Sequence, residues 1–307
     1  MFGDVEKFGF IDSILETVGS QKDYRFVYGP FFLTLCLVLS KISFSSVTLF
    51  LYEFKILNFI IYLLTVYLFY KLTKKKKLTI IFAFNPLILL ETLVNVHNDI
   101  LLLFFCLLGI FFIKKSEKII KSRIMSELEF IIGLIFFTLS ASIKYVTFII
   151  LPFFIIYKIR NKRLISKFFY IMIYLIVFLV IYGLICIPYL NNIRDFFGGI
   201  ISQSGKLKDS IYMLIAFFSN NNRNIVSIFY SIGFFILGYI FIVKILMQLF
   251  RQNDYISMME NCYIVLLSLI FLGLTNLTSW YLIWLFIPVF WTRGNYLKSL
   301  ILIRFCI

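Results

Sequence analysis

Residues 79–112 decide the fold of this chain, and they read TIIFAFNPLILLETLVNVHNDILLLFFCLLGIFF. Two apolar arms enclose a short polar segment, residues 95–99 (NVHND), which contains the only histidine of the sequence. Clusters of basic residues lie before the first arm and after the second. Because basic loops mark the cytoplasmic side of a membrane, the stretch is predicted to be a hairpin whose polar tip lies on the opposite side. Ionisable residues at such a tip indicate a functional site.

The composition is that of an integral membrane protein. Of the 307 residues, 62% are hydrophobic and 15% are charged, whereas soluble domains are about half apolar and about a quarter charged. The net charge is +15, but half of the thirty lysines and arginines lie in three clusters, at residues 71–77, 114–123 and 158–167. This spacing indicates membrane topology and contact with anionic lipids of the bilayer. It does not favour a nucleic-acid partner.

The apolar segments predict an all-α, polytopic bundle of about eight to nine membrane helices in the cell membrane. Residues 28–40 are shorter than the roughly 20 residues that a span needs, so they are predicted to form a re-entrant or interfacial helix. We expect a single integral membrane domain over residues 1–307. Within it, residues 1–26 form a polar extracytoplasmic segment, and residues 189–223 form an outer loop with a short helix at residues 211–218.

A second hairpin places a lysine beside the first tip. Residues 130–157 also lie between two basic clusters, so they are expected to turn near residues 140–145 (SASIKY), which puts Lys144 on the outer side. Each arm is short for a full bilayer, which implies local thinning or an aqueous vestibule. The predicted topology therefore gathers one set of polar and aromatic residues at the outer face: Tyr28, His97, Asn98, Asp99, Lys144, Arg194, Lys206, Lys208, Trp280 and Tyr281.

These residues have structural interpretations as well as functional ones. Asp99 would either cap the following helix or serve as a functional carboxylate. Lys144 would either extend its ammonium to the interface or bind a phosphate. Trp280 and Tyr281 would either form an interfacial aromatic belt or stack on a sugar ring. The sequence leaves these alternatives open.

The cysteines and the remaining motifs predict no bound cofactor. The five cysteines are odd in number and show no CxxC spacing, which argues against a disulfide framework and a metal site. No metal ligands are therefore assigned, although a divalent cation remains an option. No signal peptide is recognised in residues 1–26. The cysteines are Cys36, Cys106, Cys186, Cys262 and Cys306.

Four short motifs occur in order along the sequence. Residues 28–30 read YGP, and residues 85–87 (NPL) are followed by residues 94–99 (VNVHND). Residues 142–145 (SIKY) are followed by Pro152, and residues 279–284 (SWYLIW) by Pro288. Together these motifs resemble those of bacterial GT-C-type glycosyltransferases that use polyprenyl-phosphate sugars, notably the polyprenol-phosphomannose-dependent mannosyltransferases. The corresponding family motifs are the YPP/YGP start of an early helix, the NPL…HND hairpin, lK(y/p)…llP, and PWYLLWLLP, in which serine here replaces the first proline.

The resemblance implies a GT-C-like bundle that transfers a hexose, mannose above all. The donor would be a polyprenyl-phosphate sugar, and the acceptor an envelope glycan or glycolipid at the outer face. The lack of a Gly-rich nucleotide-binding loop agrees with a lipid-linked donor. Lys144 and Arg194 are expected to bind the lipid phosphate. Substrate contacts are expected from His97, Asn98, Asp99, Lys144, Tyr145, Trp280 and Tyr281.

The catalytic base is not assigned by the resemblance. In the family, an essential aspartate lies in a loop after a first helix, and this sequence shows neither that helix nor the NPY-containing loop. Asp99 is the best candidate present, while Asp4 and Asp12 lie in the expected region but match no motif. A truncated or inactive copy is therefore one expectation. Two other functions remain open: a lipid or small-solute transporter and a non-catalytic membrane protein.

Overall fold

The computed structural model describes residues 28–44, 46–118, 122–192, 207, 209–251 and 254–291. All regular secondary structure in these ranges is helical, which confirms the predicted all-α class. The first half contains α2 (Pro30–Ile42), α3 (Val47–Thr73), α4 (Lys76–Ala83), α5 (Pro86–Leu89), the π-helical turn η3 (Leu90–Val94), α6 (Asp99–Lys118), α7 (Arg123–Ala141) and α8 (Thr147–Lys158). The second half contains α9 (Leu164–Cys186), η4 (Ile187–Asn192), α11 (Ile211–Phe218), α12 (Arg223–Phe250), α13 (Tyr255–Ser268), the π-helical turn η5 (Leu269–Gly273) and the 3₁₀ helices η6 (Ser279–Phe286) and η7 (Val289–Trp291).

Fewer helices than predicted are long and apolar enough to cross a membrane. The described ranges contain five such helices, or six if α4 and the α5–η3 segment, bent by 47° at Phe84–Asn85, form one broken span. The predicted number of eight to nine is therefore not confirmed. Two of the expected crossings are not long helices: one is the short helix α8, and another consists of the 3₁₀ helices η6 and η7. Helix α2, which is expected to be re-entrant or interfacial, is also short. The expected short helix at residues 211–218 is confirmed as α11.

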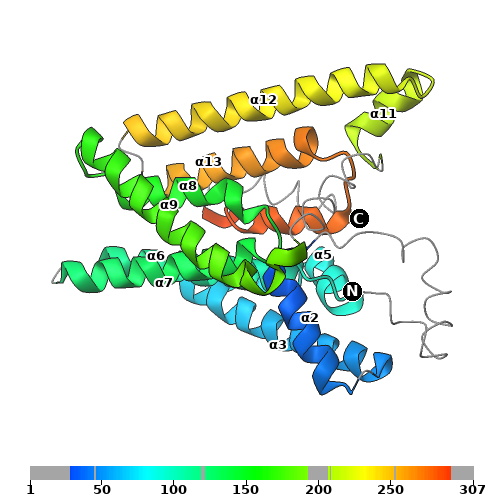
Figure 1. Ribbon diagram of the computed structural model, residues 1–307, viewed down its shortest axis with the longest axis horizontal. Helices are drawn as coiled ribbons and strands as arrows, with labels where there is room; N and C mark the ends of the chain where they lie inside the picture. The colour runs from blue at the N-terminus through cyan, green and yellow to red at the C-terminus, as the bar shows by residue number, and fades with distance from the viewer. Residues whose placement is uncertain are drawn as a thin grey trace.

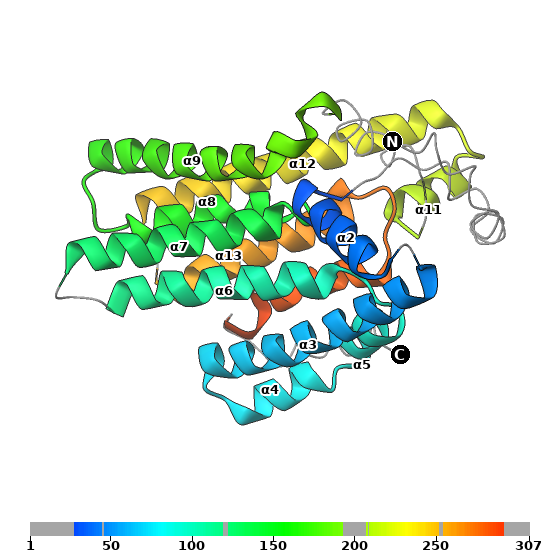
Figure 2. The same cartoon turned by 60° about the horizontal axis from the view of Figure 1, so that its bottom comes forward.

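The helices pack as two groups joined by α8. In Figure 1, α12 and α13 run side by side along one edge, while α6 and α7 form an antiparallel pair further down. Figure 2 shows α9 beside this pair and α3 on its other side. Helix α8 contacts both groups, because it packs against α13, α12, α7 and α6. The α6–α7 pair also contacts α3, α9 and η6, so it lies at the centre of the fold. The polar residues lie at the end of this pair where α6 begins and α7 ends.

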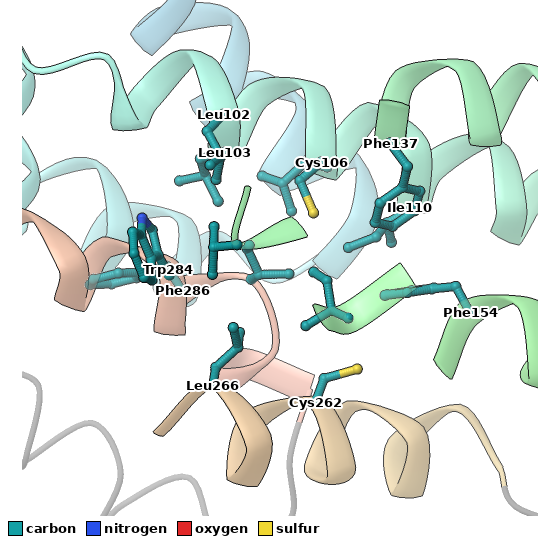
Figure 3. Close-up of a cluster of buried hydrophobic side chains, with 14 of the residues drawn as sticks. Leu102, Leu103, Cys106, Ile110, Phe137, Phe154, Cys262, Leu266, Trp284 and Phe286 are labelled. Atoms are coloured by element: carbon teal, nitrogen blue, oxygen red, sulfur yellow. The ribbon is translucent and has the colours of Figure 1, made fainter. Parts of the chain in front are cut away.

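Glycines let α6 and α7 approach closely. A Cβ atom on Gly109 would lie 2.6 Å from the ring of Phe137 and 3.0 Å from the carbonyl oxygen of Gly133. Near the other end of α7, the Ser140 hydroxyl donates to the Leu102 carbonyl oxygen at 2.9 Å. Figure 3 shows the apolar core beside this pair, to which α6, α7, α8, α13 and η6 contribute Leu102, Leu103, Cys106, Ile110, Phe137, Phe154, Cys262, Leu266, Trp284 and Phe286.

The charged residues separate to the two ends of the hairpin. At the end of α6 and the start of α7, Lys115 pairs with Glu129 at 2.6 Å, and Glu117 pairs with Arg160 from the turn that follows α8. The start of α6 lies at the opposite end, together with the turn between α7 and α8. That end carries the acidic residue of the NVHND segment and the lysine of the SASIKY turn.

Candidate functional site

A buried ion pair joins the two hairpin turns. Asp99 is the first residue of α6, and Lys144 lies in the turn between α7 and α8. The Lys144 ammonium donates to both carboxylate oxygens of Asp99, each at 2.9 Å. The indole Nε1 of Trp284, from η6, donates to the same carboxylate at 2.7 Å. Asp99 is completely buried, whereas 13% of the Lys144 side chain is exposed, so the lysine is the accessible partner.

Aromatic rings enclose the ammonium of Lys144. Its Nζ atom lies 5.0 Å from the ring centre of Tyr281, 5.3 Å from that of Trp284 and 5.8 Å from that of Tyr28. Cations within about 6 Å of an aromatic ring centre are attracted by its π face. The rings therefore stabilise a positive charge that has been removed from most of its water.

The Tyr28-Gly29-Pro30 segment is held against the Lys144 turn by backbone contacts. The Gly29 amide donates to the Ile143 carbonyl oxygen at 3.0 Å, and the Phe31 amide donates to the Ser142 carbonyl oxygen at 3.0 Å. A Cβ atom at position 29 would lie 2.3 Å from the Ser142 carbonyl oxygen, so the approach requires glycine. Burial, with a smaller contribution from the charge of Asp99, raises the pKa of Tyr28 to about 12. Its phenol therefore remains protonated at neutral pH.

A second carboxylate, Glu91, was not singled out from the sequence. It lies in the π-helical turn η3 and is 6% exposed. Its Oε1 atom accepts a short hydrogen bond from the Ser279 hydroxyl, and its Oε2 atom accepts from Asn95 Nδ2 at 3.0 Å. A lone glutamate inside an apolar arm was the available signal, and single π-helical turns are frequent at functional sites.

His97 lies between Glu91 and an aromatic ring. Its Nε2 atom is 3.6 Å from Glu91 Oε2, and 22% of its side chain is exposed. The imidazole stacks on Trp280 with ring centres 3.9 Å apart and an interplanar angle of 29°. Burial lowers the pKa of His97; the Lys144 charge acts in the same direction, while Asp99 and Glu91 oppose the shift. The imidazole is therefore neutral at pH 7.

Asn98, next to the ion pair, has unsatisfied hydrogen-bonding groups. The residue is 3% exposed, and among the residues that the structure describes neither its side-chain oxygen nor its nitrogen has a hydrogen-bond partner. Buried polar atoms are rarely left unpaired, and each exception needs an explanation such as a ligand or an ordered water. Asn98 thus offers one acceptor and two donor hydrogens beside Asp99.

The structure brings together most of the residues expected at the site. His97, Asp99, Lys144, Trp280 and Tyr281 are linked by the contacts above and by the Trp280–Tyr281 ring contact at 5.9 Å. Asn98 joins them through its place in the chain, and Trp284, Tyr28 and Glu91 complete the cluster.

The other expected residues are placed elsewhere or cannot be placed. Tyr145 hydrogen-bonds with Tyr182 of α9 and packs near Phe148, away from the ion pair. Arg194, Asp4 and Asp12 lie outside the described residues, as do Lys206 and Lys208. Within the described ranges, no group of three or more histidine, cysteine, aspartate or glutamate residues has a geometry that could hold a metal ion.

Residues 22–160 match the family model for the N-terminal domain of alpha-(1->6)-mannopyranosyltransferases. The matched segment carries Tyr28, Glu91, His97, Asp99 and Lys144, whereas Trp280 and Trp284 follow it. No curated protein matches the chain, and no solved structure does. With the long apolar helices, the family match supports a membrane glycosyltransferase in general, with a sugar donor and a glycan acceptor as substrates.

Proposed function

We propose that this protein is a membrane glycosyltransferase that moves a hexose, mannose above all, from a polyprenyl-phosphate donor to an envelope glycan or glycolipid at the outer face of the cell membrane. The observation that carries this proposal is the Asp99–Lys144 pair, enclosed by aromatic rings at the point where two hairpin turns meet. The match to a mannosyltransferase domain over residues 22–160 supports the choice of sugar.

Lys144 is suited to bind the phosphate of the donor. An ammonium has three donor hydrogens, and Asp99 accepts from two of them at 2.9 Å, which leaves one for a ligand. Tyr28, whose phenol stays protonated, lies beside the same ammonium. A fixed cation in a site with little water stabilises the negative charge that develops on a departing phosphate.

Asp99 acts as a positioning residue in this scheme. Its carboxylate is completely buried and accepts hydrogen bonds from Lys144 and Trp284. An acceptor hydroxyl therefore has no direct access to it. Its role is to keep the Lys144 ammonium charged and correctly oriented before the donor arrives.

The remaining residues of the cluster are suited to bind the sugar. Trp280 and Tyr281 present aromatic faces next to the ion pair, and the apolar face of a pyranose ring stacks on such surfaces. The unpaired amide groups of Asn98 are buried, so they are suited to reach sugar hydroxyls through an ordered water, which both donates and accepts hydrogen bonds. In the reaction, an acceptor oxygen attacks the anomeric carbon while the bond from that carbon to the phosphate oxygen breaks. The polyprenyl phosphate leaves with the electron pair, and Lys144 stabilises its charge.

Transfer assays with the purified full chain in lipid nanodiscs test this proposal. Labelled polyprenyl-phosphate mannose is offered in one reaction and labelled GDP-mannose in another, with an oligomannoside acceptor in both. We expect transfer from the lipid-linked donor alone. Lys144→Met should reduce the rate by about 100-fold to 1,000-fold, the typical effect of removing one group that stabilises transition-state charge.

Lys55→Met is the matched control, because Lys55 is an exposed lysine on α3. It should leave the rate unchanged. Transfer from GDP-mannose, or full activity of the Lys144 variant, would contradict the proposed donor and the proposed phosphate ligand respectively.

A further inference from the structure

We propose that His97 is the general base that deprotonates the acceptor hydroxyl, and that Glu91 positions it. This inference rests on the glycosyl transfer proposed above and names the residue that activates the acceptor. It is carried by the Glu91–His97–Trp280 arrangement, which lies beside the phosphate-binding lysine without being part of the ion pair.

Glu91 is fixed so that it selects one form of the imidazole. Its two carboxylate oxygens are held by Asn95, four residues further along the chain, and by Ser279 of η6. Oε2 faces His97 Nε2 at 3.6 Å, which favours the tautomer with the proton on Nε2 and a lone pair on Nδ1. Catalytic hydrogen bonds are often long before substrate binds. Nδ1 itself has no hydrogen-bond partner within the described ranges of the chain, so it is free to accept a proton.

The backbone around His97 is also held in one conformation. The His97 amide donates to the Glu91 carbonyl oxygen at 2.8 Å, and Asn58 Nδ2 donates to the His97 carbonyl oxygen at 3.5 Å. The preceding residue, Val96, has a φ of +56°, which is rare for a β-branched residue. Strained residues of this kind persist where the surrounding structure fixes them, and they cluster at active sites. Stacking on Trp280 then sets the plane of the imidazole.

His97 is the only member of the cluster with both access and a free basic atom. Asp99 is buried and occupied by Lys144 and Trp284, and Glu91 is 6% exposed with both oxygens occupied. The His97 side chain is 22% exposed. The charged groups that face it are Glu91, Asp99 and Lys144. The two carboxylates stabilise the imidazolium once it has formed, whereas burial keeps the ring neutral beforehand.

The resulting step is balanced in atoms and charge. The acceptor hydroxyl gives its proton to Nδ1 of His97 as its oxygen forms a bond to the anomeric carbon. The bond between that carbon and the phosphate oxygen breaks, and the phosphate takes the electron pair. Imidazolium and phosphate then lie on the two sides of the new glycoside, next to Glu91 and Lys144 respectively. The imidazolium returns its proton to water before the next turnover.

The single histidine makes the tautomer directly measurable. The full chain, labelled with ¹⁵N-histidine and placed in nanodiscs, gives one imidazole spin system, since the sequence has one histidine. We expect a neutral ring at pH 7 with the proton on Nε2. In Glu91→Gln, an amide NH₂ can face Nε2, so the proton should move to Nδ1. A ring protonated on Nδ1 in the wild type, or no change in Glu91→Gln, would overturn the proposed geometry without any reference to activity.

Kinetics test the chemical role separately. His97→Gln keeps a polar side chain but cannot accept a proton, and it should lower kcat by about 100-fold to 10,000-fold, the range of general-base catalysis, with little change in KM for the donor. Glu91→Gln should also lower kcat, because it stabilises the wrong tautomer. Glu53→Gln is the matched control: Glu53 also lies in an apolar helix, α3, and is expected to keep the wild-type rate.

The outcomes distinguish this inference from the proposed function. Wild-type transfer with an equally active His97→Gln would overturn the role of His97 and leave the proposed function intact. No transfer by the wild type under any donor would overturn both. A large loss of rate in His97→Gln, combined with a wild-type transfer rate that does not change with pH, would also contradict a histidine base.

Discussion

Lys144→Met is the variant whose effect on folding can be worked out most directly from the structure. It removes the cation that donates to both oxygens of Asp99 and leaves a completely buried carboxylate with the Trp284 indole as its remaining partner. Breaking a buried pair by removing one partner typically costs about 3–5 kcal/mol, because the other charge is left uncompensated. We therefore expect the free energy of unfolding to fall by about that amount.

Two further variants show how much of this stability loss comes from the interaction between Asp99 and Lys144 and how much from each charge alone. Asp99→Asn keeps the shape and an acceptor for Trp284, but leaves the Lys144 ammonium without its counter-ion; we expect a loss of about 2–3 kcal/mol, since hydrogen bonds to charged groups contribute about 1.5–3 kcal/mol. The double variant Asp99→Asn/Lys144→Met has no buried charge at this position. Neutral replacements of buried ion pairs are often close to neutral in stability, so its loss should be smaller than that of either single variant.

A double-mutant cycle on the purified full chain measures this coupling. Unfolding in mixed micelles with increasing mole fraction of sodium dodecyl sulphate, followed by tryptophan fluorescence and circular dichroism, gives the free energy of each variant. The single losses add to at least about 5 kcal/mol and the double loss is smaller than either, so we expect a coupling of at least about 3 kcal/mol, the upper end for contacting residues. If the two single effects add to within about 0.5 kcal/mol, the ion pair does not exist as described and the reasoning fails.

Three further predictions concern the surroundings of the pair. Gly29→Ala should weaken the contact with Ser142, because its Cβ atom would lie 2.3 Å from the Ser142 carbonyl oxygen; a lower melting temperature and reduced transfer would show this, and wild-type values for both would contradict it. Ser279→Ala should release one oxygen of the buried Glu91, with a stability loss of about 1–3 kcal/mol; an unchanged unfolding free energy would argue that this hydrogen bond contributes nothing. Transfer should fall on acidification with a midpoint below pH 6.5, because the pKa of His97 is lowered from 6.5 and its neutral form accepts the proton; a rate that rises on acidification would contradict the sign.

Much of the fold follows from the distribution of charge and hydrophobicity in the sequence. The basic clusters before residue 79 and after residue 113 locate the ends of the first hairpin. The cluster after residue 157 locates the end of the second hairpin, residues 130–157. From these alone the all-α class and the shared end for Asp99 and Lys144 could be inferred. The helix at residues 211–218 was also recognisable, because a continuous apolar run lies between polar loops.

The number of membrane helices could not be read from the sequence. Hydropathy identifies apolar segments but not how far each one continues as a helix. The segment at residues 279–291 is apolar enough for a crossing, yet it forms 3₁₀ turns that pack in the core and direct Trp284 toward Asp99. The bend between α4 and α5, next to Pro86, likewise divides an apolar run into two short pieces.

The members of the site that lie in the two hairpin turns could be predicted from the sequence. The members that are brought to the site by tertiary packing could not. Glu91 was not predicted as part of the cluster, because its partner Ser279 is 188 positions away in the sequence. Tyr145 was expected at the site as the neighbour of Lys144, but adjacent residues in a turn point in different directions, and its hydroxyl meets Tyr182 on α9. Trp284 belongs to a motif that was recognised, yet its role as a partner of Asp99 depends on the tertiary fold.

The most direct measurement for the account as a whole is mannosyl transfer by the double variant Asp99→Asn/Lys144→Met, compared with the wild type at equal concentrations of folded protein. The double variant is expected to fold but lacks the cation that would stabilise the departing phosphate. The account predicts transfer from polyprenyl-phosphate mannose by the wild type and a rate at least about 100-fold lower for the folded double variant. A double variant that transfers mannose at the wild-type rate would contradict it.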